Sequence, residues 1–224
     1  MRKSRFKKIT FKKTQASKRK NKKKPKPFLL HDDYFLKAKK EGYRARSVYK
    51  LIEIQEKFGI IKQNIDICDI WAAPWSFIQY TKRIIKDTGQ IVGIDLKPIN
   101  KYTQKNINTI VWDILDFNWL KKEVEKYIWK WNKFDLILSD IAPNTTWRKD
   151  IDQYASVELN IEILRFADFF LNKWWNILLK VFKWEDFRDL VIEIKKRFIK
   201  FTEYKPKACR DRSFEEYIIC FSKK

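Results

Sequence analysis

The fold of this chain is decided by the stretch DIWAAPWSF, residues 69–77. It follows a short β-branched run and precedes an amphipathic one, so it predicts a strand, a tight turn and a helix. Doubly wound α/β sheets bind ligands at such turns, outside the carboxyl ends of their strands. The next expected strand ends at Asp95, about 20 residues further on, which is the spacing at which such folds hold a ribose diol. The sequence therefore predicts a site for a nucleoside cofactor.

The alternation of segments from Asp33 onward predicts the class of fold. Short β-branched runs alternate with longer amphipathic stretches, which is typical of a parallel sheet covered by helices. We expect one α/β domain with a mostly parallel, seven-stranded sheet and helices on both faces. Ser47 is expected to cap the first helix. Expected strands span residues 65–70, 91–95, 109–111, 134–140, 176–182, 198–204 and 215–221, and expected helices span 47–58, 77–86, 156–171 and 184–197.

The charge of the chain indicates a polyanionic partner. Lys and Arg number 50 against 28 Asp and Glu, which gives a net charge of +22 over 224 residues. Such an excess favours binding that weakens with salt. Residues 1–27 hold 14 of the basic residues and no acid. We expect 1–27 to be a disordered RNA-binding arm, or merely a solubilising tail, and 28–224 to be the folded domain.

Several features argue against other classes of protein. No apolar run approaches the roughly 20 residues of a membrane-spanning helix, and the first residues contain no signal-peptide core. Three isolated cysteines suggest neither a disulfide framework nor a metal site, and His31 is the single histidine. Cys68 and Cys220 lie in apolar runs and are expected to be buried. We expect a cytoplasmic protein that needs no metal and is a monomer by default.

Four motifs in order carry a resemblance to a known family. They are KKEGYRARSVYKL at residues 39–51 with the AAP turn at 72–74, SDIAPNTT at 139–146, LKVF at 179–182, and RSFEEY at 212–217. With them the chain resembles the FtsJ-type ribosomal RNA ribose 2'-O-methyltransferases from about Asp33 to Lys223. The resemblance implies a Rossmann-like fold that uses S-adenosylmethionine, with an antiparallel last strand.

The resemblance also implies a catalytic tetrad, which maps onto Lys50, Asp140, Lys180 and Glu215. Lys180 is the implied base. A free lysine near pKa 10.4 would need a depression of about three units, roughly 4 kcal/mol, to be half neutral at pH 7. Lys50 would favour that depression by repulsion, whereas ionised Asp140 and Glu215 would oppose it. We therefore expect Lys180 mainly to orient the hydroxyl and to take its proton late.

The same resemblance implies five contacts with the cofactor. Trp75 and Phe77 would contact it from the first turn. Asp95 would hold the ribose, Asp113 the adenine, and Asp140 would lie near the methionine moiety. Without the family, each of these acids would be read as an ordinary turn former or helix cap.

The expected substrate is RNA. The basic segment from Lys37 to Arg46 is expected to lie beside the pocket and to hold phosphates. The likeness is to the compact bacterial type, which implies a uridine of 23S ribosomal RNA in the large ribosomal subunit. Transfer RNA is the alternative substrate. A non-catalytic RNA-binding protein that assists ribosome assembly is the alternative class.

The chain departs from the family in one systematic way, because tryptophan stands where the family's turns carry glycine. It has 10 Trp and 4 Gly, whereas an average content of about 7% would give roughly sixteen glycines. Such turns need positive φ or close approach to the cofactor, so we expect Trp75 to intrude on the cofactor. The positions are Trp71, Trp75, Trp112, Trp147, Trp174, Trp175 and Trp184, and Trp129 and Trp131 lie in another glycine-like turn; for Trp119 the sequence gives no indication.

Two explanations of the tryptophans are open at this point. In the first, the source organism reads UGA as glycine, and the translation used a code that reads it as tryptophan. In the second, the chain is an inactivated relative with genuine tryptophans in its pocket. The intact tetrad favours the first.

Overall fold

The computed structural model describes residues 33–98, 103–128, 133–144, 146, 148–183, 187–210 and 213–224. The expected arm at 1–27 lies outside these residues, as do Trp129, Trp131, Trp147 and Trp184.

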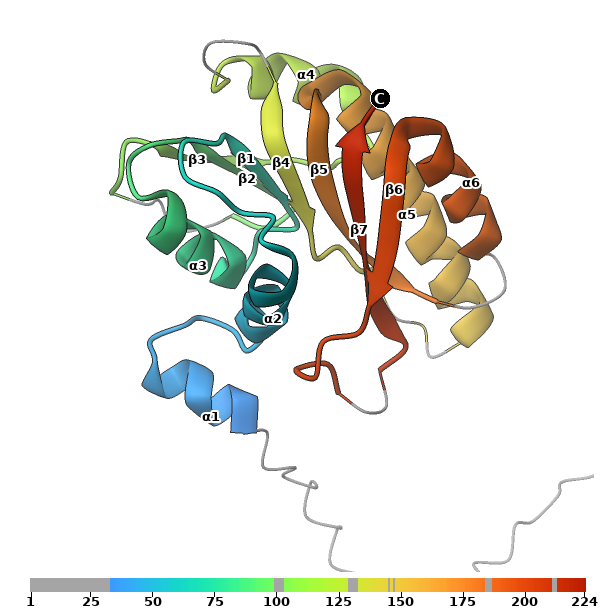
Figure 1. Cartoon of the computed structure of the whole chain (residues 1–224), viewed down its shortest axis with the longest axis horizontal. Coiled ribbons are helices and arrows are strands. Elements are labelled where there is room, and N and C mark those ends of the chain that lie inside the picture. The colour runs from blue at the N-terminus through green and yellow to red at the C-terminus, as the bar shows by residue number, and fades with distance from the viewer. Residues whose placement is uncertain are drawn as a thin grey trace, which may run out of the picture. The chain divides into compact units, whose positions relative to one another are not determined.

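A single seven-stranded sheet organises the described residues, in the order β3-β2-β1-β4-β5-β7-β6 (Figure 1). Strands β1 to β5 pair in parallel, and β7 is antiparallel to both of its neighbours, β5 and β6. This confirms the mostly parallel sheet and its antiparallel last strand. The strands are β1 (Ile67–Ile70), β2 (Ile91–Asp95), β3 (Ile107–Val111), β4 (Phe134–Ser139), β5 (Leu171–Phe182), β6 (Phe198–Tyr204) and β7 (Glu215–Lys223).

Helices cover both faces of the sheet, as expected. Those that the sequence pattern predicted are α2 (Val48–Phe58), α3 (Ser76–Ile85), α5 (Lys149–Phe170) and α6 (Phe187–Arg197). Two further helices were missed, α1 (Asp33–Lys40) and α4 (Phe117–Glu125). Each is short, with 8 residues in α1 and 9 in α4, so its apolar periodicity extends over little more than two turns and is a weak signal in the sequence.

The expected cap of α2 was wrong. Ser47 has a helical φ of −57° and makes no side-chain capping bond. Its Oγ lies 2.8 Å from Oγ of Ser76, at the start of α3. A tertiary contact between α2 and α3 therefore replaces the local cap.

Alternate residues of the strands build two apolar cores, one on each face of the sheet. Cys68 and Ile70 of β1 pack with residues of α4, α5 and α6, whereas Ile67 packs with residues of α2 and α3. This is the period-two alternation of a strand that is buried on both faces. Cys68 and Cys220 are fully buried, which confirms that they act as small core residues.

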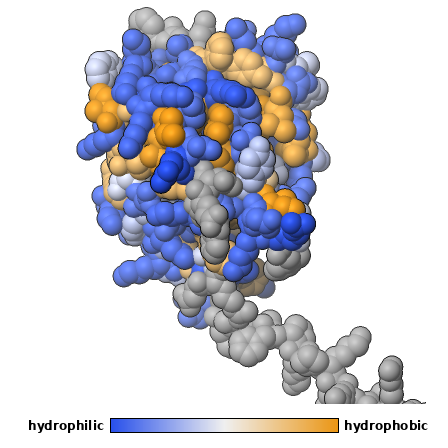
Figure 2. Space-filling model, turned by 90° about the vertical axis from the view of Figure 1, so that its right-hand side faces the viewer, coloured by the Kyte–Doolittle hydropathy of each residue, from blue (hydrophilic) through white to orange (hydrophobic). Residues whose placement is uncertain are grey.

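The flank of the sheet that carries α6 and β6 is mostly hydrophilic (Figure 2). Ile192 of α6 and Ile199 of β6 are among its exposed hydrophobic side chains. Scattered apolar residues are normal on a protein surface. Lys200 is exposed on the edge strand β6, and lysine on an edge disfavours pairing with another chain.

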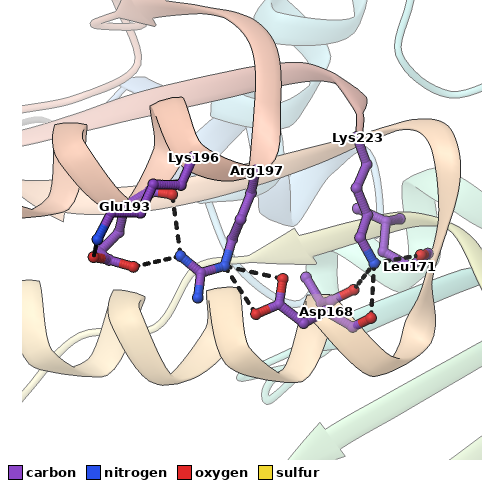
Figure 3. A network of polar contacts seen from close by, with 7 residues as sticks. Asp168, Leu171, Glu193, Lys196, Arg197 and Lys223 are labelled. Atoms are coloured by element: carbon purple, nitrogen blue, oxygen red, sulfur yellow. Dashed lines mark hydrogen bonds and ion pairs between the residues drawn. The ribbon is translucent and has the colours of Figure 1, made fainter.

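The carboxyl end of α5 is fastened by basic side chains (Figure 3). Lys223 is 8% exposed and donates hydrogen bonds to the carbonyls of Ala167, Asp168 and Leu171. Nε of Arg197 lies 2.9 Å from both carboxylate oxygens of Asp168. Lys223 thus supplies donors at a helix end, where carbonyls lack partners further along the helix, and Arg197 pairs with the Asp168 side chain of the same helix end. Burial lowers the pKa of Lys223 to about 8, so the group is still mostly an ammonium at pH 7.

Replacing Lys223 with methionine should destabilise the fold by about 1–3 kcal/mol, because the buried carbonyls lose their donor. The midpoint of urea unfolding at pH 7 measures this, provided the slope is unchanged. Lys200→Met, an exposed lysine on the neighbouring strand, is the matched control and should be neutral. Equal midpoints for both variants would show that water replaces the Lys223 ammonium at no cost.

Candidate active site

The four tetrad positions converge at the carboxyl ends of β4 and β5. Lys50 comes from α2, Asp140 follows β4, Lys180 lies in β5, and Glu215 begins β7. Nζ of Lys50 lies 2.8 Å from Oε2 of Glu215, and Nζ of Lys180 lies 3.0 Å from Oδ1 of Asp140. Both lysines are buried, at 8% and 7% exposure. The structure thus brings together two lysine–carboxylate pairs from four elements.

Asp140 couples the two pairs electrostatically. Burial favours its neutral form, but Lys180 and Lys50 outweigh burial and hold the pKa of Asp140 below its usual value. For Lys50, burial acts to lower the pKa, and Asp140 and Glu215 raise it above the ordinary value. Lys50 is therefore a cation and Asp140 an anion at neutral pH.

Tyr217 is a site residue that the sequence analysis missed, although it lies in the RSFEEY motif. Its hydroxyl donates to Oδ1 of Asp140 at 2.6 Å. Nζ of Lys50 lies 5.8 Å from the centre of its ring. Burial, followed by the charges of Asp140 and Glu215, raises the pKa of Tyr217 well above the ordinary value. The phenol stays protonated and fixes the Asp140 carboxylate.

Helix α5 positions the strand that carries Lys180. The buried Asn160 donates from Nδ2 to the carbonyl of Lys180 at 2.8 Å, and Oγ of Ser156 accepts from the amide of Phe182 at 3.1 Å. These bonds satisfy backbone groups at the end of β5, beyond its last pair with β4, Ser139↔Leu179. Asn160 and Ser156 were not identified from sequence, because a polar residue on a long helix gives no local signal of its partner.

A polar hollow of about 210 Å³ lies against the Lys50–Glu215 pair. Arg46, Ser47, Arg210 and Ser213 complete its lining. The hollow is rich in cationic donors, which suits a phosphate-bearing ligand.

A second cavity lies over the carboxyl ends of β1, β2 and β3, where the cofactor is expected. It measures about 160 Å³, and Asp95, Asp113, Trp71 and Trp112 are among its lining residues. Asp95 is 4% exposed and accepts from the amides of Ala73 and Lys97, each at 2.8 Å. Asp113 accepts from the amide of Leu115 at 3.0 Å. Both acids therefore stand at the expected strand ends and are held by backbone donors.

Asp69 is a third acid at this edge, and its surroundings are unusual. It is 1% exposed, and neither carboxylate oxygen has a hydrogen-bond partner among the described residues. Burial first, and then the charges of Asp140 and Asp95, raise its pKa well above the ordinary value. A buried carboxyl group without a partner is costly. The raised pKa favours the neutral form of Asp69, and the acids that line the cavity are Asp95 and Asp113.

Trp75 and Phe77 do not line this cavity. Both are buried, at 1% and 3% exposure, and pack with the α2 and α3 side of the core. The expectation that the Trp75 ring intrudes on the cofactor was therefore wrong. The ring packs against Gly93 of β2, where an added Cβ would lie 3.0 Å from Cζ3 of Trp75. Any contact of these two residues with a cofactor would have to be made by their backbone.

Solved structures share this architecture. A ribosomal RNA methyltransferase from Plasmodium falciparum has a TM-score of 0.70 and 28% identity, covering 81% of this chain and 98% of that one. Fibrillarin of Aeropyrum pernix, in complex with natively bound S-adenosyl-L-methionine, has a TM-score of 0.55 and 15% identity, covering 78% and 76%. The fold and its acidic strand ends define an S-adenosylmethionine-dependent methyltransferase.

The chain belongs to the FtsJ-like methyltransferase family, whose model matches residues 43–223. Two relatives are each named ribosomal RNA large subunit methyltransferase E. The one from Desulforapulum autotrophicum is 37% identical over 201 residues, 90% of this chain and 97% of the relative. The one from Pelagibacter ubique is 40% identical over 189 residues, 84% and 90%. The resemblance to the family is therefore confirmed.

The acids in the lining of this cavity fit S-adenosylmethionine in charge. The cofactor carries a sulfonium and an ammonium group, which suit Asp95 and Asp113. The cavity of about 160 Å³ is smaller than the roughly 300 Å³ at the lower end for clefts that enclose a ligand of this size. The indoles of Trp71 and Trp112 lie in its lining and narrow it.

Within the described residues, no helix is long and apolar enough to cross a membrane. The same residues contain no cluster of three or more metal-ligating side chains.

Proposed function

We propose that this methyltransferase modifies a ribose 2'-hydroxyl of RNA, and that its substrate is a uridine of 23S ribosomal RNA in the large subunit. The observation that carries the proposal is the pairing of Lys180 with Asp140 beside Lys50 and Glu215, between the cofactor cavity and the cationic hollow. The names of the large-subunit relatives support the substrate.

The proposed roles of the four side chains follow from their charges. S-adenosylmethionine supplies a methyl group already activated by its sulfonium, so the hydroxyl mainly needs alignment. Lys180, fixed by Asp140, orients the hydroxyl. It takes the hydroxyl proton late, as a neutral amine that has first released its own proton to water. Lys50 and Glu215 hold the ribose and its neighbouring phosphate at the rim. The five positions Trp75, Phe77, Asp95, Asp113 and Asp140 remain the proposed cofactor contacts, the first two through backbone.

The RNA is proposed to lie along α1 and the segment that follows it. Lys37 and Lys40 are exposed there, and Nζ of Lys37 lies 4.7 Å from the centre of the Tyr49 ring. Arg46 lines the cationic hollow and donates to the carbonyl of Ala208. Basic side chains thus continue from the surface into the site, as phosphate binding requires.

The double variant Lys37→Glu, Lys40→Glu should weaken RNA binding at least about tenfold, because two phosphate contacts become repulsive, and the salt dependence should become shallower. Binding is measured by titrating labelled 23S RNA fragments at several salt concentrations. Cofactor affinity should be unchanged. Lys195→Glu with Lys196→Glu on α6 is the control, since it makes the same change in charge elsewhere. RNA binding that falls equally in both variants would refute a specific RNA surface on α1.

Transfer of labelled methyl to large ribosomal subunits that lack 2'-O-methylation tests the proposal directly. The chain is compared with a variant that has glycine at the seven tryptophan positions 71, 75, 112, 147, 174, 175 and 184, here called the glycine form. Label on one ribose supports the proposal. Label on transfer RNA alone would mean that transfer RNA, and not ribosomal RNA, is the substrate. RNA binding without label on either would favour the alternative of a non-catalytic assembly protein.

We further infer a cytoplasmic protein that acts as a monomer and needs no metal. The location follows from the proposed ribosomal substrate. Unchanged methyl transfer after treatment with a chelator, together with a monomeric mass in solution, is the expected result.

A further inference from the structure

We propose that the natural protein carries glycine at positions 71, 75 and 174, because its gene encodes them with UGA codons that the source organism reads as glycine. The same reading assigns glycine to the other positions of the seven, Trp112 and Trp175 among the described residues. The inference concerns the residues themselves and does not depend on the RNA substrate.

The backbone supplies the first observation. Trp71, Trp75 and Trp174 have φ values of 69°, 80° and 69°. Positive φ is uncommon outside glycine and is an outlier for a bulky residue, because Cβ meets the backbone. In the described residues, six positions other than glycine have positive φ, and these three tryptophans are half of them. Glycine adopts this conformation without the steric penalty.

The place of each turn supplies the second observation. Trp71 follows β1 and Trp75 immediately precedes α3, so both belong to the turn that faces the cofactor. Trp174 lies where β4 and β5 change register, between the pairs Phe134↔Leu171 and Leu136↔Asn176. A bulge with a left-handed residue is a characteristic position for glycine.

The surroundings of the rings supply the third observation. The Trp174 side chain is 70% exposed, so little packing offsets its backbone strain. Nε1 of Trp112 is buried with no hydrogen-bond partner among the described residues, although a buried indole usually finds one. Trp71 and Trp112 line the cavity expected to hold the cofactor and narrow it. Glycine would remove the backbone strain at 174, the unpaired indole nitrogen at 112 and the narrowing of the cavity at 71 and 112.

The competing explanation is a chain that lost its activity and kept genuine tryptophans. Loss of function would relax the whole site, yet both lysine–carboxylate pairs are formed and the acids at the strand ends remain. A change in how one codon is read affects that one residue type, whereas decay of the gene does not.

Position 75 provides the most stringent test of the proposal, because the Trp75 ring packs in the core beside Gly93. The ring of a genuine tryptophan would pack well there, and only its positive φ would be unfavourable. Finding glycine at 75 would therefore show that the turn conformation, and not the ring's packing, reflects the natural residue.

Peptide mass spectrometry of the protein isolated from its source organism tests the proposal. Trypsin should release residues 63–82, which contain positions 71 and 75, and residues 106–121, which contain position 112. Both peptides keep the same ends whichever residue is present. Glycine masses at 71, 75 and 112, with UGA codons in the gene, are expected. Tryptophan at 71 or 75, or UGG codons there, would overturn the proposal. The spectra read residue masses and not activity, so this result is independent of the methyl-transfer assay.

Discussion

Replacing Lys180 with methionine in the glycine form should lower the rate of methyl transfer by about 10²- to 10⁴-fold. The expected loss is large because the Lys180 ammonium is the group that Asp140 holds, at 3.0 Å, toward the proposed hydroxyl. Methionine keeps the length of the side chain and removes its donors and its charge. Single-turnover methyl transfer with saturating cofactor measures the chemical step without product release.

Lys200→Met, the exposed lysine on β6, is the control for the change of residue type and should keep the full rate. Cofactor affinity and the unfolding midpoint are measured alongside, because Lys180 is buried and its loss also affects Asp140. A Lys180→Met variant that is folded, binds cofactor and transfers methyl at the full rate would eliminate both the orienting role and the proton-accepting role.

Replacing Trp71 and Trp112 together with glycine should raise the affinity for S-adenosylmethionine by about 100-fold, equivalent to about 2.8 kcal/mol. The physical reason is space, since both indoles line a cavity of about 160 Å³. Isothermal titration of the chain and its variant with S-adenosylmethionine measures the difference.

Trp174→Gly is the matched control, because this residue lies near the amino end of β5, away from the carboxyl-end cleft. It should leave the affinity unchanged and improve stability by relieving positive φ. Equal affinities for the parent chain and the Trp71→Gly, Trp112→Gly variant would mean that the indoles move aside when the cofactor binds. The narrowing of the cavity would then no longer support glycine at these positions.

The formed lysine–carboxylate pairs indicate an active enzyme, whereas the cavity narrowed by Trp71 and Trp112 indicates weak cofactor binding. Glycine at the turns reconciles the two observations. Lys50, Asp140, Lys180 and Glu215 form two short ion pairs, and Asp69 lacks a hydrogen-bond partner within the described residues. Asp95 and Asp113 line the cavity expected to hold the cationic cofactor. Glycine at the turns would give that ligand room without altering any of these acids or lysines.

The sequence by itself determined the class of fold and the order of its main elements. The apolar, β-branched run 91–95 coincides with β2, because a strand buried on both faces leaves a continuous local signal. The run 198–204 coincides with the edge strand β6, which is partly exposed. The motifs also predicted the four side chains of the tetrad. The tryptophans at glycine-like positions indicated which turns are unusual. These features depend on residues that are close together in the sequence.

The tertiary structure alone decided where side chains point and which distant groups meet. Ser47 bonds to Ser76 and does not cap its helix, Tyr217 fixes Asp140, and the Trp75 ring turns into the core. Lys50 and Glu215 are 165 positions apart in sequence, so no local pattern encodes their contact. Such contacts depend on how α2, α5 and β7 pack against the sheet, and packing is a property of the whole fold.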